Sequence, residues 1–380
     1  MKRMKQQTFD IVGGGIAGLS TALALSQKGI DFRLFEQAQS YRPIGAGIIL
    51  ANNALEVYQR LGIYEAIKAK SSPIRAMHIC DEQLRPLSTV EIAQLGTKLG
   101  SLALHRADLQ DILLEQLDLN KIKMGHQLQS FQQEGKELLL DFADAGQYRA
   151  EQLLAADGLY SKLRTFVEPQ ALIRGSKQLC WRGLCQLELP PKYQNQLFEA
   201  WGKARRFGFV PIGQGWLYYY ALLSYEESPE ELDQSQLLDY FQDFHPLVQQ
   251  IIAAEAKLHE DEIRDLSPIK NWHKGPVCLL GDAAHALTPN MGQGACQSIE
   301  DAYVLAHYLA EKSPEAAYAA YQASRQKKAL KVVQNSWQIG QMAHWKSGWA
   351  RQLRNGLMRL TPNSLTAKSS AHIFSFQAPH

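Results

Sequence analysis

The chain has 380 residues and a formal net charge of +2, so it is long enough for roughly two or three domains and carries no large excess of either charge. This balance gives no reason to expect a nucleic acid or an anionic membrane surface as a partner. Five scattered cysteines, without C-x-x-C pairs or zinc-type spacing, indicate free thiols in a reducing cytoplasm and no metal site. The first residues lack the features of a signal peptide, and no apolar run reaches the ~18 residues of a spanning helix.

The first elements form the pattern of a dinucleotide-binding unit. A short apolar strand is predicted at 8–12, the sequence G-G-G-I-A-G follows at 13–18, and a helix of small and apolar residues comes next. A second strand at 30–35 ends in Glu36. This order of strand, glycine turn, helix, strand and acid is typical of a Rossmann unit.

Each glycine of this G-x-G-x-x-G pattern has a physical reason. Gly13 permits the tight turn, Gly15 lets a pyrophosphate approach the backbone, and Gly18 lets the helix pack closely on the strand. Glu36 stands where a carboxylate accepts a hydrogen bond from a ribose hydroxyl. An acid at this position favours FAD or NAD over NADP.

The next stretch contains a second glycine-rich connection at 42–48, a helix at 53–62 and a hairpin of strands at 74–80 and 84–92. A periodic helix is predicted at 109–117, with Asp108 as its cap. Arg106 precedes that helix, where it could contact a phosphate or be a solvated surface arginine.

Two later strands end in an acid beside a glycine. The strand at 152–156 ends in Asp157-Gly158, and the strand at 277–280 ends in Gly281-Asp282. A proline turn, P-N-M-G-Q-G at 289–294, then opens a helix. Because ligands bind at the carboxyl edge of parallel sheets, we expect these acids to face a cofactor.

The middle of the chain, 178–223, is rich in strands and aromatic residues and predicts a mostly antiparallel sheet to which the 74–92 hairpin is added. Helices are expected at 233–244, 246–255 and 313–333. The tail at 335–359 reads as a tryptophan-containing helix. Packing on the body or a subunit contact is favoured over a membrane surface there.

Taken together, these signatures resemble the single-component (class A) flavoprotein monooxygenases, the para-hydroxybenzoate-hydroxylase-like family. The resemblance implies an α/β fold in which a Rossmann-like FAD-binding domain of the glutathione-reductase type carries an inserted, mostly antiparallel β-sheet substrate domain and a helical C-terminal tail. The expected boundaries are 1–73, 93–175 and 265–334 for the FAD domain, 74–92 and 176–264 for the substrate domain, and 335–380 for the tail.

The resemblance also assigns cofactor-binding residues. It places Gly13, Gly15 and Gly18 on the FAD pyrophosphate, Glu36 on the adenosine ribose and Asp282 on the ribityl chain. Asp157 belongs to a motif that serves both FAD and the pyridine nucleotide, Arg106 contacts FAD, and the start of the last motif helix lies against the pyrimidine edge of the flavin. The remaining members of this set are Ala17, Gln37, Gly47, Gly292, Gly294 and Ala295.

The family chemistry that follows is hydroxylation of a small aromatic or heteroaromatic substrate. NADH or NADPH binds transiently and reduces FAD, and O2 adds at flavin C4a to give a hydroperoxide that transfers one oxygen atom. Strand alternation nominates Arg206 to hold an anionic substrate and Tyr218 or Tyr220 to activate a phenol-like group. Arg182 is a further candidate, and surface position or sheet packing is the alternative for each. His285 is expected to make a structural hydrogen bond.

Other functions on the same fold are an epoxidase, a reductase, a halogenase or a non-catalytic flavoprotein. The absence of a W-x-W-x-I-P sequence argues against the halogenase, and intact cofactor signatures argue against lost cofactor binding. The expected partners are the small-molecule substrate and at most a second copy of the chain, as a monomer or homodimer, without nucleic acid or integral membrane association.

Overall fold

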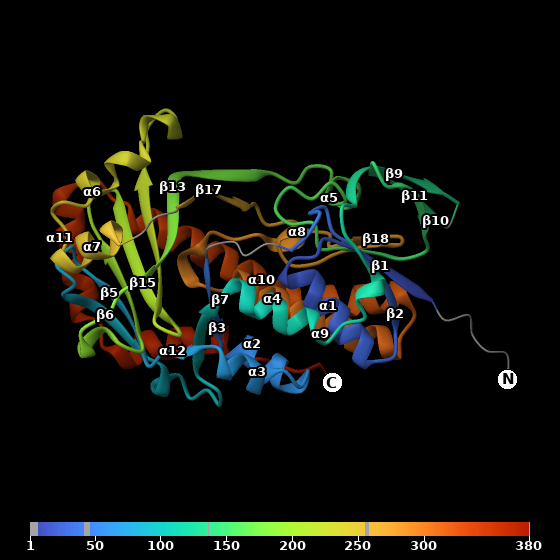
Figure 1. Cartoon of the computed structure of the whole chain (residues 1–380), viewed down its shortest axis with the longest axis horizontal. Helices are drawn as coiled ribbons and strands as arrows, with labels where there is room; N and C mark the ends of the chain where they lie inside the picture. Colours follow the sequence, from blue (N-terminus) through green and yellow to red (C-terminus); the bar gives the residue numbers. More distant parts are fainter. Residues whose placement is uncertain (1–6, 42–45, 136, 255–257, 380) are drawn as a thin grey trace.

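The computed structural model describes residues 7–41, 46–135, 137–254 and 258–379. Two large sheets stand at opposite ends of an elongated molecule (Figure 1). Part of the predicted glycine-rich connection at 42–48 lies outside the described residues. The last residue of the predicted 246–255 helix also lies outside them. The α/β class, the mostly antiparallel second sheet and the helical C-terminal region are confirmed.

The first sheet is built around parallel strands whose side chains are buried on both faces. Its order is β18 (His273–Lys274), β19 (Val277–Leu279), β12 (Leu153–Ala155), β1 (Thr8–Val12), β2 (Asp31–Phe35) and β8 (Ile122–Lys123). All neighbours are parallel except β18 and β19. Because β1, β12 and β19 come from distant parts of the sequence, their carboxyl ends bring separate motifs to one edge.

The second sheet is the predicted antiparallel one, with the early hairpin added at its edge. Its order is β17 (His259–Leu266), β13 (Ile173–Gln186), β16 (Trp216–Ser224), β15 (Arg205–Gly213), β14 (Gln196–Trp201), β5 (Ala76–Cys80) and β6 (Pro86–Glu91). Only β14 and β5 pair in parallel. The long strands β13 and β17 continue from this sheet towards the first one along the top of the view in Figure 1.

Two three-stranded sheets complete the β structure. One contains β11 (Gly146–Ala150), β10 (Glu137–Ala143) and β9 (Gln127–Glu134), and the other contains β3 (Gly47–Ala51), β7 (Ser101–His105) and β4 (Ser72–Pro73). The strands missing from the sequence prediction are β3, β4, β7, β11, β14 and β18. The β14 sequence Q-L-F-E-A-W has a carboxylate inside an apolar run, which obscures the alternation expected of a strand.

The helices surround the first sheet and cover one face of the second. They are α1 (Ile16–Gln27), α2 (Asn52–Arg60), α3 (Tyr64–Ala69), α4 (Arg106–Leu114), α5 (Arg164–Val167), α6 (Leu237–Tyr240), α7 (Pro246–Ala253), α8 (Asp282–His285), α9 (Gly294–Glu311), α10 (Pro314–Ala343), α11 (Gly348–Leu360) and α12 (Asn363–Phe374). The predicted cap of α4 is wrong. His105 occupies the N-cap, where its ring accepts from the Ala107 N–H, and Asp108 lies inside the first turn.

Among the described residues, each end of the molecule has its own large hydrophobic core. The larger core contains the first sheet with α1 and α9, and the smaller one contains one face of the second sheet with α6 and α7. The other face of the second sheet joins the larger core through Val210, Ile212 and Tyr218. The long helix α10 crosses from one end to the other, about 45 Å at 1.5 Å per residue, and therefore couples the two sheets.

Candidate active site

Four sequence motifs meet at the carboxyl edge of the first sheet. Gly13 follows β1, Glu36 follows β2, Asp157 lies two residues after β12, and Asp282 lies three residues after β19. Pairing in register of β1 with β2 and β12, and of β12 with β19, fixes this arrangement. One edge therefore presents a glycine turn and three carboxylates, which suits an extended ligand with hydroxyl and phosphate groups.

The glycine turn after β1 is shaped by close backbone contacts. Gly13 has φ of +106°, and a Cβ atom there would lie 2.2 Å from the Ala156 carbonyl oxygen. A Cβ at Gly18 would lie 1.9 Å from the Gly13 carbonyl oxygen, whereas the Cβ position of Gly15 has nothing within 4 Å. Gly13 and Gly18 thus permit the packing of turn, strand and helix, and Gly15 leaves the open side for a phosphate.

Glu36 is oriented by the backbone at the end of β2. Its carboxylate accepts hydrogen bonds from the Gly14 N–H at 2.6 Å and the Ala38 N–H at 2.8 Å. Gln37 is exposed beside it. A carboxylate held at this position beside the glycine turn can accept a hydrogen bond from a hydroxyl group of a ribose bound across the turn.

Asp157 is tied to the turn that follows it. One carboxylate oxygen accepts from the Lys162 N–H at 3.0 Å, while the other oxygen is buried without a hydrogen-bond partner among the described residues. Burial raises the pKa of this carboxyl. The buried guanidinium of Arg164 donates to the Leu159 and Ala283 carbonyls, at 2.5 and 3.2 Å, and so links the Asp157 turn to α8.

Asp282 is the first residue of α8 and follows Gly281, which has φ of +54°. A Cβ at Gly281 would lie 2.6 Å from Ser298 Oγ and 3.1 Å from Ala17 Cβ, so the turn packs against the starts of both α1 and α9. The Asp282 side chain reaches the solvent. Many protein atoms lie around its carboxyl group, and the resulting desolvation raises its pKa. The nearby charge of Arg106, at the start of α4, acts in the opposite direction.

The start of α9 offers free backbone N–H groups next to open space. Gly292 has φ of +60°, and the Cβ positions of Gly292 and Gly294 have no atom within 4 Å. The first backbone bond of the helix runs from the Gln297 N–H to the Gln293 carbonyl at 2.9 Å, so the N–H groups of Gly294 and Ala295 precede that ladder. An 18-residue helix places the positive end of its dipole here, which favours a negative charge.

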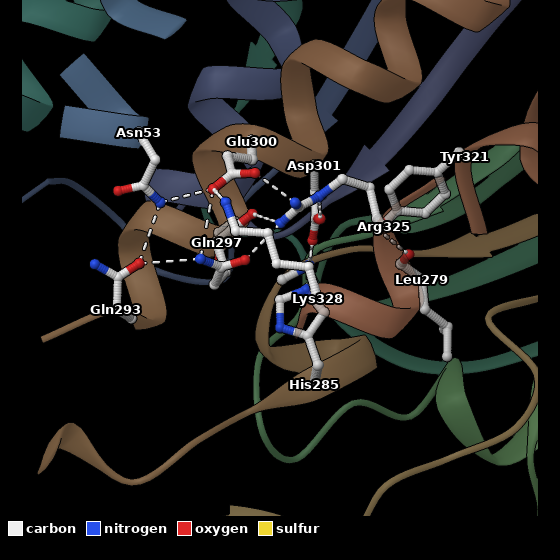
Figure 2. Close-up of polar contacts among 12 residues, drawn as sticks. Asn53, Leu279, His285, Gln293, Gln297, Glu300, Asp301, Tyr321, Arg325 and Lys328 are labelled. Carbon is white, nitrogen blue, oxygen red and sulfur yellow. Dashed lines mark hydrogen bonds and ion pairs between the residues drawn. The ribbon is translucent and has the colours of Figure 1, made fainter. Parts of the chain in front are cut away.

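A buried polar network supports the base of this site (Figure 2). On α9, Glu300 and Asp301 face Arg325 of α10, which donates to both carboxylates and, at 2.7 Å, to the side-chain oxygen of Gln297. Lys328 adds a second cation, with its Nζ 2.6 Å from Glu300. Two carboxylates therefore face two cations, and the network is balanced in charge.

The network reaches both flanks of the site. At one end, Asn53 of α2 donates to Glu300 at 2.6 Å and to Gln293 at 3.1 Å. At the other end, the Nε2 atom of His285 lies 2.5 Å from Asp301, which also accepts a hydrogen bond from the Gly281 N–H at 3.1 Å. Although burial alone would raise it, the charges of His285 and Arg325 hold the pKa of Asp301 below its ordinary value. The expected structural role of His285 fits this geometry.

On the second sheet, Arg206 is buried, so the alternative of a surface arginine is wrong. Its guanidinium donates to Glu199 at 3.1 Å, to Asn290 at 2.6 Å and to His344 at 2.8 Å. Asn290 belongs to the proline turn before α9 and also donates to the Ser336 carbonyl at 2.7 Å. Arg206 thus joins the second sheet, the proline turn and the end of α10.

Tyr220 reaches the same cluster by crossing a glycine. A Cβ at Gly208 would lie 2.1 Å from the Tyr220 ring, so the missing side chain lets the ring cross β15 towards β14. There the Tyr220 hydroxyl donates to Glu199 at 2.5 Å. Burial and the Glu199 charge raise the pKa of Tyr220 well above its ordinary value. Tyr220 therefore orients Glu199 and stays protonated.

Tyr218 lies on the same face of β16, nearer to the cofactor motifs. A Cβ at Gly47 would lie 2.6 Å from the Tyr218 side chain, so Gly47 allows β3 and β16 to approach. Burial raises the pKa of Tyr218, and the charges of Arg182 and, more weakly, Arg106 oppose that rise. Arg182 itself is paired with Asp261. A protonated phenol beside two cations is suited to donate a hydrogen bond to a partly negative oxygen.

Several residues of the site escaped the sequence prediction. Glu199 lay in the missed strand β14. His344 lay inside the predicted tail helix at 335–359, which the structure interrupts between Ala343 and Gly348. Asn290 was part of the motif but had no assigned role. The one usable signal was the buried pair Glu300 and Asp301, because two acids within an apolar helix require a cation such as Arg325.

Within the described residues, no group of three or more His, Cys, Asp and Glu side chains is arranged to hold a metal ion. The features above fit FAD instead. Glycines leave open space at Gly15 and Gly294, the buried Gln293 Nε2 and one Asp157 oxygen have no described partner, and the three carboxylates lie along one edge.

Comparisons with known proteins agree with this geometry. A family model described as "FAD binding domain" matches residues 5–336. The chain is 34% identical over 360 residues to "Aurachin C monooxygenase/isomerase" of Stigmatella aurantiaca, covering 93% of this chain and 94% of the relative. It is 31% identical to "2-heptyl-3-hydroxy-4(1H)-quinolone synthase" of Pseudomonas aeruginosa, covering 97% and 98%. The crystal structure of Klebsiella pneumoniae HpxO with FAD and uric acid superposes with a TM-score of 0.89 at 25% identity, covering 97% of both chains.

Proposed function

Because the chain belongs to the FAD-binding-domain family and is an FAD-dependent monooxygenase, we propose that its substrate is a neutral, bicyclic nitrogen heteroaromatic compound with an alkyl substituent, of the 4-quinolone class. The observation that carries this proposal is the likeness along almost the whole chain to two proteins, one of which is named for the product 2-heptyl-3-hydroxy-4(1H)-quinolone.

The proposed reaction replaces one ring C–H by C–OH. It consumes O2, NAD(P)H and one proton and yields NAD(P)⁺ and water, so that one oxygen atom enters the product and the other leaves as water. When bound, FAD takes a hydride from NAD(P)H and supplies the electrons that activate O2. In a quinolone, the ring nitrogen donates electron density to the carbon beside the oxo group, which makes that carbon a suitable nucleophile.

The charges of the second sheet support a neutral substrate. Arg206 was predicted to hold an anionic substrate, but its guanidinium already bonds Glu199, Asn290 and His344. The cluster therefore offers no uncompensated cation. We assign Arg206 and Tyr220 to positioning, because they hold the proline turn and Glu199 in place next to the substrate.

Tyr218 is the residue that we assign to the substrate itself. Its raised pKa keeps the phenol protonated, so it donates a hydrogen bond to the oxo group rather than accepting a proton. The positive charges of Arg182 and Arg106 strengthen that donor. The first N–H groups of α9 favour the negative charge that develops on a reduced flavin ring, and a Gly294 without a side chain lets the ring approach them.

A second candidate is a purine-like substrate. The superposition on the uric acid complex of HpxO supports it, since that protein shares 25% identity and nearly the full fold. Uric acid is an anion at neutral pH, so this candidate requires Arg206 to exchange a present partner for the substrate.

The test compares 2-heptyl-4(1H)-quinolone with uric acid, using purified yellow holoenzyme and both NADH and NADPH. Quinolone-stimulated NAD(P)H oxidation with a product heavier by one oxygen atom is the expected result. Tyr218→Phe is expected to lower that product yield by about 10–100-fold without loss of FAD. Oxidation and hydroxylation with uric acid alone would replace the quinolone proposal by the purine one.

A further inference from the structure

The C-terminal helix α11 turns an apolar ridge to the solvent. Trp349, Leu353, Leu357 and Leu360 are exposed to 73%, 54%, 58% and 80%. Their spacing of three or four residues puts them on one side of the helix, within about 80° at 100° per residue. These four side chains are called the α11 ridge below.

The opposite side of α11 packs on the body through arginines instead of leucines. Arg351 pairs with Glu82 in the turn between β5 and β6. Arg354 is buried, with its guanidinium 5.0 Å from the centre of the Trp201 ring and its Nη1 atom 3.0 Å from the Met342 carbonyl oxygen. The helix is therefore inverted relative to an ordinary surface helix, whose leucines face the core. Packing on the body, as the sequence suggested, accounts for the arginines but leaves the ridge uncovered.

Positive charge borders the ridge at its C-terminal end. Near Leu360, Arg359 and Arg85 both bond to Asp81, at 3.0 and 2.8 Å. The two arginines are 49% and 72% exposed while Asp81 is only 5% exposed, so the surface there presents an excess of one positive charge.

Near the start of α11, Lys346 and Lys203 line a surface depression together with Glu226 and Glu231. Lys346 is bonded to Glu226 at 2.8 Å, so the two lysines and the two glutamates balance in charge at this end. In the sequence, moreover, residues 316–380 contain no Asp or Glu, so neither α11 nor its flanking segments carry an acid that an anionic surface would repel.

We propose that the α11 ridge docks on an anionic phospholipid membrane, with the helix lying in the interface parallel to the surface. A row of Trp and Leu can enter the boundary between headgroups and acyl chains, while Arg359 and Arg85 reach phosphates at its C-terminal end. This is surface attachment, and within the described ranges no helix has the length and hydropathy to cross a bilayer. The inference uses only α11 and its surroundings and is independent of the substrate proposed above.

The experiment is flotation of the FAD-loaded full-length enzyme with vesicles of phosphatidylcholine containing about one third phosphatidylglycerol, with pure phosphatidylcholine vesicles in parallel. The wild type is expected to float with the anionic vesicles, at least several-fold more than with the neutral ones. The double variant Leu353→Gln/Leu357→Gln is expected to lose at least about tenfold in bound fraction.

The matched control is Leu119→Gln/Leu172→Gln, which replaces two leucines that are 62% and 68% exposed elsewhere on the surface. It is expected to float as the wild type does, and FAD content and thermal melting should be unchanged in both double variants. A wild type that stays in solution overturns the proposal, as does equal loss in the control. A wild type that is a dimer without vesicles, and a monomer only in the ridge variant, overturns it in favour of a second copy covering the ridge.

Discussion

Two buried arginines, Arg325 and Arg206, organise the two sides of the active site in different ways. Arg325 bonds to groups 24 to 28 residues away, all on the neighbouring helix α9. Arg206 bonds to Glu199, Asn290 and His344, which are 7, 84 and 138 residues away and lie on three separate elements. The first cluster fixes the scaffold under the cofactor, and the second joins parts that meet only in the finished fold.

This difference has a consequence for stability and function. The Arg325 cluster lies inside one pair of packed helices, so its loss is expected to act on folding. The Arg206 cluster lies between the substrate sheet, the proline turn and α10, so its loss is expected to act on how these parts are positioned. Four substitutions test this division, and the expected change in unfolding free energy decreases from the first to the last.

Arg325→Met is expected to have the largest effect. It leaves the buried Glu300 and Asp301 without their shared cation, which costs about 3–5 kcal/mol in a buried pair. Urea denaturation monitored by circular dichroism measures the change. Arg205→Met, which removes a more exposed pair with Asp243, serves as the control and should cost at most about 1 kcal/mol. A similar loss in both variants would contradict the assigned role of the Arg325 cluster.

Glu199→Gln is expected to destabilise the protein by about 1–3 kcal/mol, because the amide keeps hydrogen-bonding capacity but loses the charge opposite Arg206. FAD content should stay at the wild-type level, while substrate-stimulated NAD(P)H oxidation should fall about tenfold or more as the proline turn and Tyr220 lose their common anchor. The control Glu262→Gln removes a comparable carboxylate bonded to Tyr225 at 2.6 Å on the same sheet and should leave turnover unchanged. Loss of FAD with unchanged turnover per flavin would refute the positioning role.

His344 makes the second cluster sensitive to acid. Burial, followed by the charge of Arg206, lowers its pKa well below the ordinary 6.5. The unfolded chain therefore binds a proton near pH 6.5 that the native state does not, so stability is complete above that pH and decreases as the pH falls below it. The slope contributed by this group is up to about 1.4 kcal/mol per pH unit. In urea titrations between pH 5 and 7, His344→Gln should show a slope smaller by this amount, and an unchanged slope would exclude His344 as its source.

Asp282→Ala is expected to change the unfolding free energy least, by no more than about 0.5 kcal/mol without FAD, because the side chain is accessible. Its effect should appear in cofactor binding, as a lower ratio of flavin to protein absorbance after purification. The same measurement on Asp111→Ala, a surface carboxylate of α4, provides the baseline. Full flavin content in the Asp282 variant would show that this carboxylate does not hold the cofactor.

The sequence predicts the features that depend on residues close together in the chain, and it misses those that depend on residues far apart in the chain. The strand at 8–12 and the glycine turn after it were predicted with accurate bounds, because turn geometry and apolar runs are local properties. The strand β14 was missed, since Glu199 interrupts its apolar pattern for a reason that lies on other strands. The C-terminal region was expected to be helical, but no local pattern showed that α11 would bury Arg354 and expose Leu353.

The sequence alone determined the FAD-binding family, the presence of a second, mostly antiparallel sheet and the acids at the strand ends, because each rests on local patterns of residues. Tertiary structure decided the state of the side chains over the site. In the folded protein, Arg206 is paired with Glu199, and the Tyr220 ring crosses Gly208 to bond to the same carboxylate. Tyr218 lies next to Gly47, near the cofactor edge. These outcomes depend on which strands become neighbours, and burial then fixes each charge and proton through desolvation, which no stretch of sequence contains by itself.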